Sequence, residues 1–523
     1  MRLNVRPLMD AIETYIRKSN DELEDTLEEE GYISPAVAVV AINRIEDCIA
    51  TAYREQAEKI LKGIEAADDI EDFAYEIWPD IRDENNLMKA LKEIFEPEFT
   101  DLMHSFTKSW LLEEAPDLVE DDRVSRPALQ FVQDWSTELS RLMQLSSNDQ
   151  IENILKEAVN EHLSVQDVSL KISDSGIRDE GYRSRRVALT EVLRIESYSQ
   201  LEYMRQDPAV EKKEWFHTGS HKNKPRPNHV AMNGQKVGVD EPFELKGKDG
   251  GTYFPMCPRD TGLPASESNN CHCLMKPIRN KKILGMSTEE RREMRQKYMD
   301  EVDAEWENKM AAEEESKIKW PEKGETISPE QFKEVMRYAR EKDVRISGFK
   351  QFDGDIQTVK DLVDDVEGIA KDYPLIREGK KPVTIHLDEW IDSNDFAVTR
   401  NHVICINANA YRDTVKLAEE YQKLVDAGWF VKGTDYRSII RHEIGHVIEY
   451  KYELDGLEAV KKITETKSNM EALNIVKKEL SEYAALVDRE IVSESFSGAY
   501  SSGEKNEFAL QVINSFGIIQ EKE

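Results

Sequence analysis

The chain has 523 residues, too many for one ordinary hydrophobic core, so we expect about three domains. Its 104 Asp and Glu outnumber its 71 Lys and Arg, and the net charge of −33 argues against nucleic acid or an anionic membrane as a partner of the whole surface. Hydrophobic residues make up 39% of the chain, too many for wholesale disorder, and its 5 cysteines, an odd number, do not make a disulfide framework.

The first residues, Met1 to Pro7, run directly into a charged amphipathic pattern and lack the apolar core of a signal peptide. No stretch has the length of uncharged apolar sequence that is needed to span a bilayer. We therefore expect the protein to act in the cytoplasm where it is made, or to be packaged from there.

Residues 1 to about 165 are predicted to be helical. Ser34-Pro35 offers an N-cap followed by a proline at the first helical position. Apolar residues then recur at spacings of three and four, as in Ile42, Ile45, Ile49 and Tyr53. Because this region has no chemical motif, we expect a helical scaffold or docking arm.

Residues 203–280 are richer in Gly, Pro and His and carry 12 Lys or Arg against 9 Asp or Glu. Thiolates and imidazoles gathered in such a loop-rich stretch are the ligands of structural zinc sites. The candidate ligands are Cys257, Cys271, Cys273 and His229, and His217 and His221 lie nearby in the sequence. The alternative is a set of ordinary reduced cysteines in a small core, because a C-x-C tether is strained for two ligands on one ion.

An ordered series of residues accompanies these cysteines. It consists of Arg186, Thr190-Glu191, Trp215, Arg226, His229, Gly234, Pro242-Phe243, Pro255 and Asn270-Cys271-His272-Cys273. Because of these residues and their order, the segment 141–280 resembles the head-morphogenesis domain of tailed phages, the type represented by the phage Mu F minor head protein. That family usually ends in Asn-Cys-Arg-Cys, so His272 replaces an arginine whose role is thereby in doubt.

The resemblance implies a minor capsid protein that works with the portal and capsid proteins during head assembly. It would be found in the host cytoplasm during assembly and afterwards in the virion head.

Residues 281–349 are expected to form a charged helical linker. From Ser287 to about Ile318 the sequence is charged nearly all round, as in a long solvated helix between two domains. A coiled-coil partner site is the alternative, but sustained heptads are missing. Pro321, Gly324 and Pro329 then lead into a C-terminal domain of residues 350–523.

The C-terminal domain contains the motif His442-Glu443-Ile444-Gly445-His446 in an apolar-periodic stretch. Residues four apart share a helical face, so the two imidazoles can converge on one metal ion while Glu443 reaches toward a water on that ion. A loop at 433–436 is predicted to start this helix, with Thr434 or Asp435 as N-cap. Two short strands are predicted upstream, at 382–387 and 402–407.

A catalytic zinc ion takes three protein ligands and keeps a fourth position for water. Glu490 and Glu494 are four residues apart and either could face the metal; we favour Glu490, with Glu494 as a supporting residue or alternative ligand. Tyr483 lies two helical turns before Glu490 and shares its face if the helix is continuous. A solvated acidic face for the glutamates and a core position for the tyrosine remain open.

This segment resembles the lethal-factor-like zincin metallopeptidase domains that occur at the ends of multidomain phage and mobile-element proteins. The matching runs are His442 to His446, Ser481-Glu482-Tyr483-Ala484 and Glu490 to Phe496, in which Ser493 departs from the usual alanine. The resemblance implies Zn2+ held by His442, His446 and Glu490. It further implies Glu443 as proton acceptor and Tyr483 as an assisting residue, acting on a peptide or protein substrate.

These features together predict an α+β multidomain protein with a helical scaffold at 1–140, the head-morphogenesis module at 141–280, the linker at 281–349 and a zincin-like domain at 350–523. We expect a phage minor head protein that carries a zinc peptidase. The alternative is a structural virion protein with an inactive zincin fold. A DNA-binding packaging factor would need a basic surface, which only residues 203–280 could supply, so direct nucleic acid binding is not expected.

Overall fold

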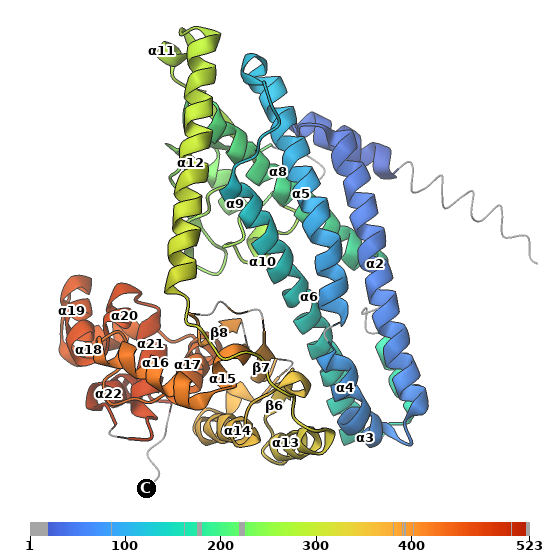
Figure 1. Cartoon of the computed structure of the whole chain (residues 1–523), viewed down its shortest axis with the longest axis vertical. Coiled ribbons are helices and arrows are strands. Elements are labelled where there is room, and N and C mark those ends of the chain that lie inside the picture. The colour runs from blue at the N-terminus through green and yellow to red at the C-terminus, as the bar shows by residue number, and fades with distance from the viewer. Residues whose placement is uncertain are drawn as a thin grey trace, which may run out of the picture. The chain divides into compact units, whose positions relative to one another are not determined.

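The computed structural model describes residues 19–518, except 85, 162, 175–179, 219–224, 380, 390, 392–393, 401 and 504. These residues are mostly helical with small sheets, which confirms the expected α+β multidomain class (Figure 1). The chain forms two compact units. Unit 1 comprises Met1–Leu61, Asn86–Gln150 and Ser169–Glu314, and unit 2 comprises Lys62–Asn85, Ile151–Val168 and Glu315–Glu523.

Long helices form the first part of the chain, as the apolar periodicity predicts. They are α2 (Pro35–Ala66), α5 (Asn86–Glu114), α6 (Arg126–Asn160), α7 (Val165–Asp174) and α8 (Glu180–Gln206). Most of their residues belong to unit 1, and parts of α2, α6 and α7 belong to unit 2. Helix α2 begins at the predicted proline, and Ile42, Ile45 and Ile49 on its inner face are completely buried. They pack in one core with Phe95 and Phe99 of α5, whose rings stack at 5.2 Å. Residues 1–18 of the predicted helical region lie outside the described residues.

A small module of strands and short helices completes unit 1. Strand β1 (Val210–Phe216) pairs antiparallel with β2 (Lys236–Gly238) and with β5 (Leu274–Arg279), while β3 (Leu245–Lys246) pairs with β4 (Thr252–Tyr253). The short helices are α9 (Pro227–Met232), α10 (Ala265–Ser268) and α11 (Lys281–Leu284). The register of β1 and β5 places Phe216 opposite Leu274, which brings the two chain segments beyond these residues side by side.

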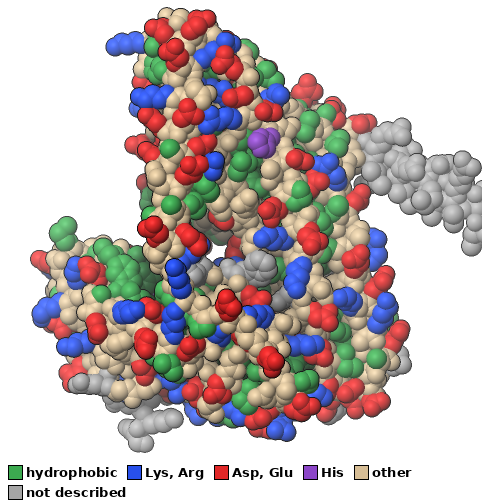
Figure 2. Space-filling model, in the orientation of Figure 1, with side chains coloured by type: hydrophobic (Ala, Val, Ile, Leu, Met, Phe, Trp, Pro, Cys, Tyr) green, Lys and Arg blue, Asp and Glu red, His purple; other side chains and the backbone are tan. Residues whose placement is uncertain are grey.

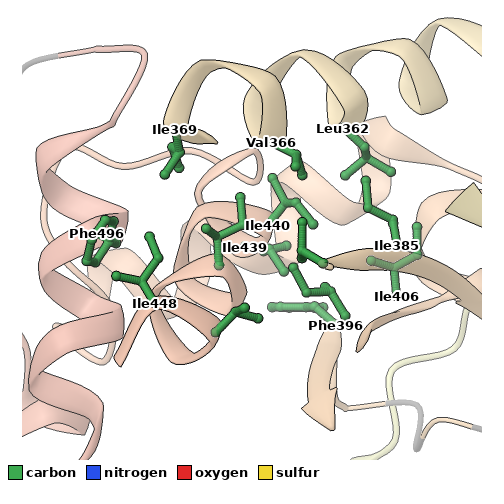
Figure 3. Packing of buried hydrophobic residues seen from close by; sticks show 14 of the residues in the cluster. Leu362, Val366, Ile369, Ile385, Phe396, Ile406, Ile439, Ile440, Ile448 and Phe496 are labelled. Atoms are coloured by element: carbon green, nitrogen blue, oxygen red, sulfur yellow. The ribbon is translucent and has the colours of Figure 1, made fainter. Parts of the chain in front are cut away.

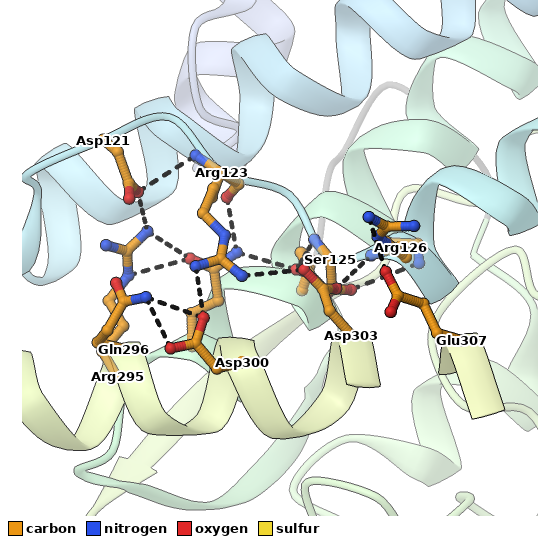
Figure 4. Close-up of polar contacts among 12 residues, drawn as sticks. Asp121, Arg123, Ser125, Arg126, Arg295, Gln296, Asp300, Asp303 and Glu307 are labelled. Carbon is orange, nitrogen blue, oxygen red and sulfur yellow. Dashed lines mark hydrogen bonds and ion pairs between the residues drawn. The ribbon is translucent and has the colours of Figure 1, made fainter. Parts of the chain in front are cut away.

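Helix α12 (Thr288–Ser316) covers most of the predicted linker helix and has few apolar positions. Only Arg295 and Met299 are buried along it. Ion pairs dock it on the loop that follows η2 (Pro116–Leu118), as Figure 4 shows: Arg123 contacts Asp300 at 3.0 Å and Asp303 at 2.9 Å. This helix is therefore attached to unit 1, up to its last residues, rather than solvated on all sides.

The rest of the predicted linker belongs to the core of unit 2. Helix α13 (Pro329–Glu341) and strand β6 (Arg345–Ser347) bury Phe332, Val335 and Ile346 in the same hydrophobic cluster as the C-terminal segments. The expected boundary at residue 350 therefore lies too far along the chain. The many charged residues on the outer face of α13 make its few buried apolar residues hard to recognise in the sequence. The sequence therefore suggests a longer linker than the structure has.

A four-stranded sheet of order β6-β7-β9-β8 lies in unit 2. Strands β7 (Thr384–Asp388) and β9 (Val403–Asn407) confirm the two predicted strands, and they run parallel to each other and to β6. The edge strand β8 (Ala397–Arg400) is antiparallel to β9. Both β7 and β9 are buried along their whole length, as strands covered on both faces must be.

Helices α14 (Ile356–Ala370) and α17 (Ser438–Tyr452) pack against this sheet. Figure 3 shows Leu362, Val366 and Ile369 of α14 above Ile440 of α17 and Ile385 of β7, all in one cluster. The remaining helices are α3 (Ile70–Asp72), η1 (Phe73–Ile77), α4 (Trp78–Asp83), η3 (Phe349–Gln351), η4 (Pro374–Ile376), α15 (Ala408–Tyr411), α16 (Thr414–Asp426), α18 (Gly456–Thr464), α19 (Asn469–Glu479), α20 (Glu482–Leu486), α21 (Glu490–Ala499) and α22 (Glu507–Ser515).

The surface in Figure 2 carries acidic and basic side chains interspersed over the visible face. No single extended basic area is seen on this face. Among the described residues, no helix combines the length and the apolar character that crossing a bilayer requires.

Candidate functional site

Helix α17 carries the motif residues His442, Glu443 and His446, and it begins at Ser438. The predicted N-cap is wrong: the cap position is Arg437, which makes no side-chain capping bond. Asp435 instead accepts a hydrogen bond from the Arg437 backbone N–H, one turn before the helix. Ion pairs to a neighbouring helix fix the start of α17 instead. Arg437 and Arg441 both pair with Asp365 of α14, at 2.9 and 2.8 Å.

The second helix of the site, α21, crosses α17 at very short range. All ten of its residues are buried. A Cβ atom on Gly445 would lie 2.6 Å from the Cα of Ser493, so only glycine allows this approach. The close crossing brings Glu490, at the first turn of α21, under the two motif histidines.

The three expected ligands come together in the structure. The Nε2 atoms of His442 and His446 lie 3.3 and 3.1 Å from the same oxygen, Oε2 of Glu490. One ligand atom from each residue lies within 4.8 Å of the other two. The two histidines are partly exposed while Glu490 is buried, so the group is open on the histidine side.

The shared carboxylate governs the charge of this group. Burial alone would lower the pKa of His442, but its hydrogen bonds to Glu490 and Glu494 outweigh burial and raise the pKa to about 10. The pKa of His446 rises to about 9, because hydrogen bonds to Glu449 and Glu490 likewise outweigh burial. Burial raises the pKa of Glu490, but the two imidazoles reverse that effect and lower it below its usual range. Without a cation, the imidazoles therefore hold protons as counter-charges to the carboxylate.

Glu494 lies behind the group rather than within it. Its Oε1 accepts a hydrogen bond of 2.8 Å from Nδ1 of His442, the ring nitrogen that points away from Glu490. Glu443 is buried beside the histidines, and the hydroxyl of Thr399, on the edge strand β8, donates to its Oε2 at 2.6 Å and to its carbonyl oxygen at 3.1 Å. Strand β8 thus fixes the direction of the Glu443 carboxylate.

Tyr483 lies next to the group, although the helix is not continuous from Tyr483 to Glu490. Helix α20 ends at Leu486 and α21 begins at Glu490. The Tyr483 ring stacks on His442 at 6.2 Å and on Trp429 at 5.5 Å. Burial, followed by the nearby Glu490 carboxylate, raises the pKa of the Tyr483 hydroxyl, so it remains a proton donor at neutral pH.

A second group of ligand atoms lies in unit 1. His229, Cys271 and Cys273 are buried and have ligand atoms within 4.8 Å of one another. Nδ1 of His229 lies 3.5 Å from Sγ of Cys271 and 3.7 Å from Sγ of Cys273. Cys257, which we expected to be a ligand, is fully buried in the same hydrophobic cluster but is not part of this group of described residues, and His221 lies outside the described residues.

The cysteine group sits inside the core of the small module. Trp215 packs edge-on against both His229, at 6.0 Å, and Phe243, at 5.2 Å. The Phe243 backbone N–H donates to Pro255, and the Arg226 guanidinium donates to the carbonyl of Asn269. Trp215, His229, Phe243 and Pro255 of the ordered series therefore lie together in this core.

Two residues of these sites, Thr399 and Glu267, are not identified by the sequence, and a third, His217, is noted there but is not among the expected ligands. Thr399 holds Glu443, Glu267 binds His229, and His217 lies beside Cys273 with Nδ1 and Sγ 3.6 Å apart. Thr399 and Glu267 have no recognisable spacing to their partners, so only the fold identifies them. His217 could have been chosen as a candidate ligand, because it follows a strand that pairs next to the cysteine run.

Comparison with known proteins finds a family match in the middle of the chain and one relative. Residues 149–276 match the family described as "Phage Mu protein F like protein". The chain is 30% identical over 312 residues to the "Uncharacterized protein YqbB" of Bacillus subtilis (strain 168), an alignment that covers 56% of this chain and 97% of YqbB. This chain belongs to the YqbB family and contains a Phage Mu F-like domain.

The Phage Mu F-like domain supports a role in phage head morphogenesis. Its bounds fall within the segment that the sequence resemblance indicated, and they include His229, Cys271 and Cys273. The match to YqbB leaves a large part of this chain without a counterpart in that protein. No solved structure matches the chain.

Proposed function

We propose that this Phage Mu F-like protein is a minor head protein that works with the portal and capsid proteins during head assembly, and that unit 2 is a zinc-dependent peptidase. The family match supports the first part. One observation carries the second part: His442, His446 and Glu490 converge, with Glu443 and Tyr483 beside them.

The donor atoms fit a zinc ion. Zinc lies about 2 Å from histidine and carboxylate ligands, so a tetrahedral arrangement separates neighbouring donors by roughly 3.3 Å. Both Nε2 atoms lie 3.3 and 3.1 Å from Oε2 of Glu490. Two imidazoles and one carboxylate are a donor set of catalytic zinc, and the exposed side of the group leaves space for a fourth ligand. When bound, zinc supplies Lewis-acid activation of water and of a carbonyl group.

The residues around the donors suit peptide hydrolysis. Glu443, oriented by the Thr399 hydroxyl, would accept the proton of the attacking water and pass it to the leaving amine. Tyr483 keeps its proton because its pKa is raised, so its hydroxyl would donate a hydrogen bond to the oxygen on which negative charge develops. Glu494 would hold the His442 ring through Nδ1 and leave Nε2 for the metal.

Hydrolysis of a peptide library by the full-length protein, with zinc content measured in parallel, tests the peptidase. Glu443→Gln should lower the rate by at least about 100-fold while keeping the zinc content of the wild type. Glu471→Gln, the same change at an exposed position on α19, should have no effect. A zinc-loaded wild type without activity on any peptide would favour the alternative, a structural virion protein with an inactive fold.

Co-purification from phage-producing cells tests the head-assembly role. A tagged chain should be recovered with the portal protein and detected in purified virions. Its absence from both the portal complex and the virion would overturn this part of the proposal and would not affect the peptidase part.

A further inference from the structure

We infer that His229, Cys271 and Cys273 hold a structural zinc ion in the Phage Mu F-like domain, with His217, which lies beside Cys273, as the fourth ligand. This site is independent of the proposed peptidase, since all four residues belong to unit 1. It also differs from the set expected from the sequence, because His217 takes the place of Cys257.

The pairing of β1 with β5 brings His217 and Cys273 together. Phe216 at the end of β1 lies opposite Leu274 at the start of β5 in an antiparallel pair. In that register the next opposed residues are His217 and Cys273, whose Nδ1 and Sγ atoms are 3.6 Å apart. The His217 backbone N–H donates to Asn233 Oδ1 at 2.8 Å, which fixes the chain at this point.

The distances are those of a tetrahedral zinc site. Zinc lies about 2.3 Å from sulfur and about 2.1 Å from nitrogen, so a sulfur and a nitrogen on one ion are roughly 3.6 Å apart. Nδ1 of His229 lies 3.5 and 3.7 Å from the two sulfurs, and Nδ1 of His217 lies 3.6 Å from Sγ of Cys273. His217 is not among the residues whose ligand atoms all lie within 4.8 Å of one another, so it would have to move toward the other three to complete the site. Nδ1 of His229 faces both sulfurs, as it would if the three atoms bound one cation.

A buried carboxylate orients the central histidine. Nε2 of His229 lies 2.9 Å from Oε2 of Glu267, and the side chains are only 2% and 1% exposed. Glu267 is itself held by Asn228 Nδ2 and by the Lys248 backbone N–H, each at 3.0 Å. A carboxylate on the outer nitrogen of a histidine is the usual support of a metal ligand, because it fixes the ring and increases its basicity.

Burial of this group indicates a structural rather than a catalytic ion. His229, Cys271 and Cys273 are all buried and only His217 is partly exposed, whereas both histidines of the unit 2 group are partly exposed. Four protein ligands leave no position for a substrate. The strands of this module are 2 to 7 residues long, so a metal that joins the end of β1, helix α9 and the segment before β5 would supply stability that so small a core lacks.

Metal analysis of the full-length chain tests the assignment. The double variant His442→Ala/His446→Ala removes the unit 2 ligands and should still contain one zinc per chain. Adding Cys271→Ser and Cys273→Ser should remove it. Two matched controls should keep it: Cys257→Ser, another buried thiol of the same core, and His272→Gln, which lies between the two ligands in sequence but pairs with Glu30.

Cobalt spectra make the test independent of whether the cysteine variant folds. Cobalt-loaded protein with cysteines intact should show a thiolate-to-cobalt charge-transfer band, and Glu267→Gln should keep that band while lowering metal affinity by about 10- to 100-fold. The inference is overturned if the His442→Ala/His446→Ala variant contains no zinc, or if its cobalt form lacks the thiolate band. Loss of zinc in Cys257→Ser but not in His217→Ala would overturn the assignment of His217.

Discussion

Gly445 of α17 lies directly against Ser493 of α21, where an added Cβ would meet the Ser493 Cα at 2.6 Å. Gly445→Ala should therefore push α21 away and separate Glu490 from the two histidines. We expect an overpacking cost of about 1 to 3 kcal/mol in the free energy of unfolding and a large loss of zinc affinity. Urea titration of the metal-free chain and zinc titration measure the two effects.

Gly368→Ala is the matched control for this change. Gly368 is also a helical glycine of unit 2, on α14, but a Cβ there has no atom within 4 Å. The alanine should raise stability by about 0.5 to 1 kcal/mol and leave zinc binding unchanged. Equal zinc affinity in the two variants would show that the close crossing does not position Glu490.

Glu490 and Glu494 should respond differently to removal. Glu490→Ala removes a ligand and should abolish tight zinc binding. Glu494→Ala removes only the acceptor on Nδ1 of His442 and should weaken zinc binding by about 10- to 100-fold. Isothermal titration with zinc distinguishes the two roles. If Glu494→Ala weakened zinc binding more than Glu490→Ala, Glu494 would be the ligand and Glu490 the supporting residue.

Glu196 should make unit 1 less stable at alkaline pH. Burial raises the pKa of this carboxyl to about 8, although Arg259 and the Ile33 N–H act in the opposite direction. Because the pKa is raised on folding, stability is fully present below the unfolded value and is lost as pH rises through about 8. Between pH 5 and pH 8 the loss should approach roughly 4 kcal/mol.

Glu196→Gln should flatten this pH dependence, because the amide oxygen can still accept the hydrogen bond from Ile33. Urea unfolding midpoints at pH 5, 6.5 and 8 provide the measurement. A variant whose midpoint falls as steeply as that of the wild type would assign the pH dependence to another group.

Arg295 and Arg126 both join α12 to the rest of unit 1, but they should contribute unequally. The Arg295 side chain is 5% exposed, and its guanidinium donates to Gln206 at 2.8 Å and to Asp121 at 3.0 Å. Arg126 is 51% exposed and pairs with an exposed Glu307. We expect Arg295→Ala to cost about 2 to 3 kcal/mol and Arg126→Ala less than about 1 kcal/mol. Thermal unfolding in low and high salt checks both values, and equal losses would contradict this account of the docking.

The local elements could be predicted from the sequence because their signals are local. Proline at position 35 marks the start of α2, and the runs at 382–387 and 402–407 became strands β7 and β9. The motif spacing at 442–446 places both histidines on one helical face. These features depend only on backbone preference and periodicity.

The rest depends on contacts between distant segments. The pairing of His217 with Cys273 requires the β1–β5 register, and the Thr399 bond to Glu443 requires the edge position of β8. Helical spacing would place Tyr483 beside Glu490 only in a continuous helix, and the chain breaks between α20 and α21. Tyr483 still stacks on His442, with Trp429 against the same ring. Tertiary packing, rather than helical spacing, sets the position of Tyr483.

The central claim, a zinc ion between α17 and α21, is tested most directly by anomalous diffraction at the zinc edge from crystals of the zinc-loaded protein. We predict a peak about 2 Å from Nε2 of His442, Nε2 of His446 and a carboxylate oxygen of Glu490. A map with no peak between these three residues, or with Glu490 turned away from a zinc ion held by other ligands, would contradict the account.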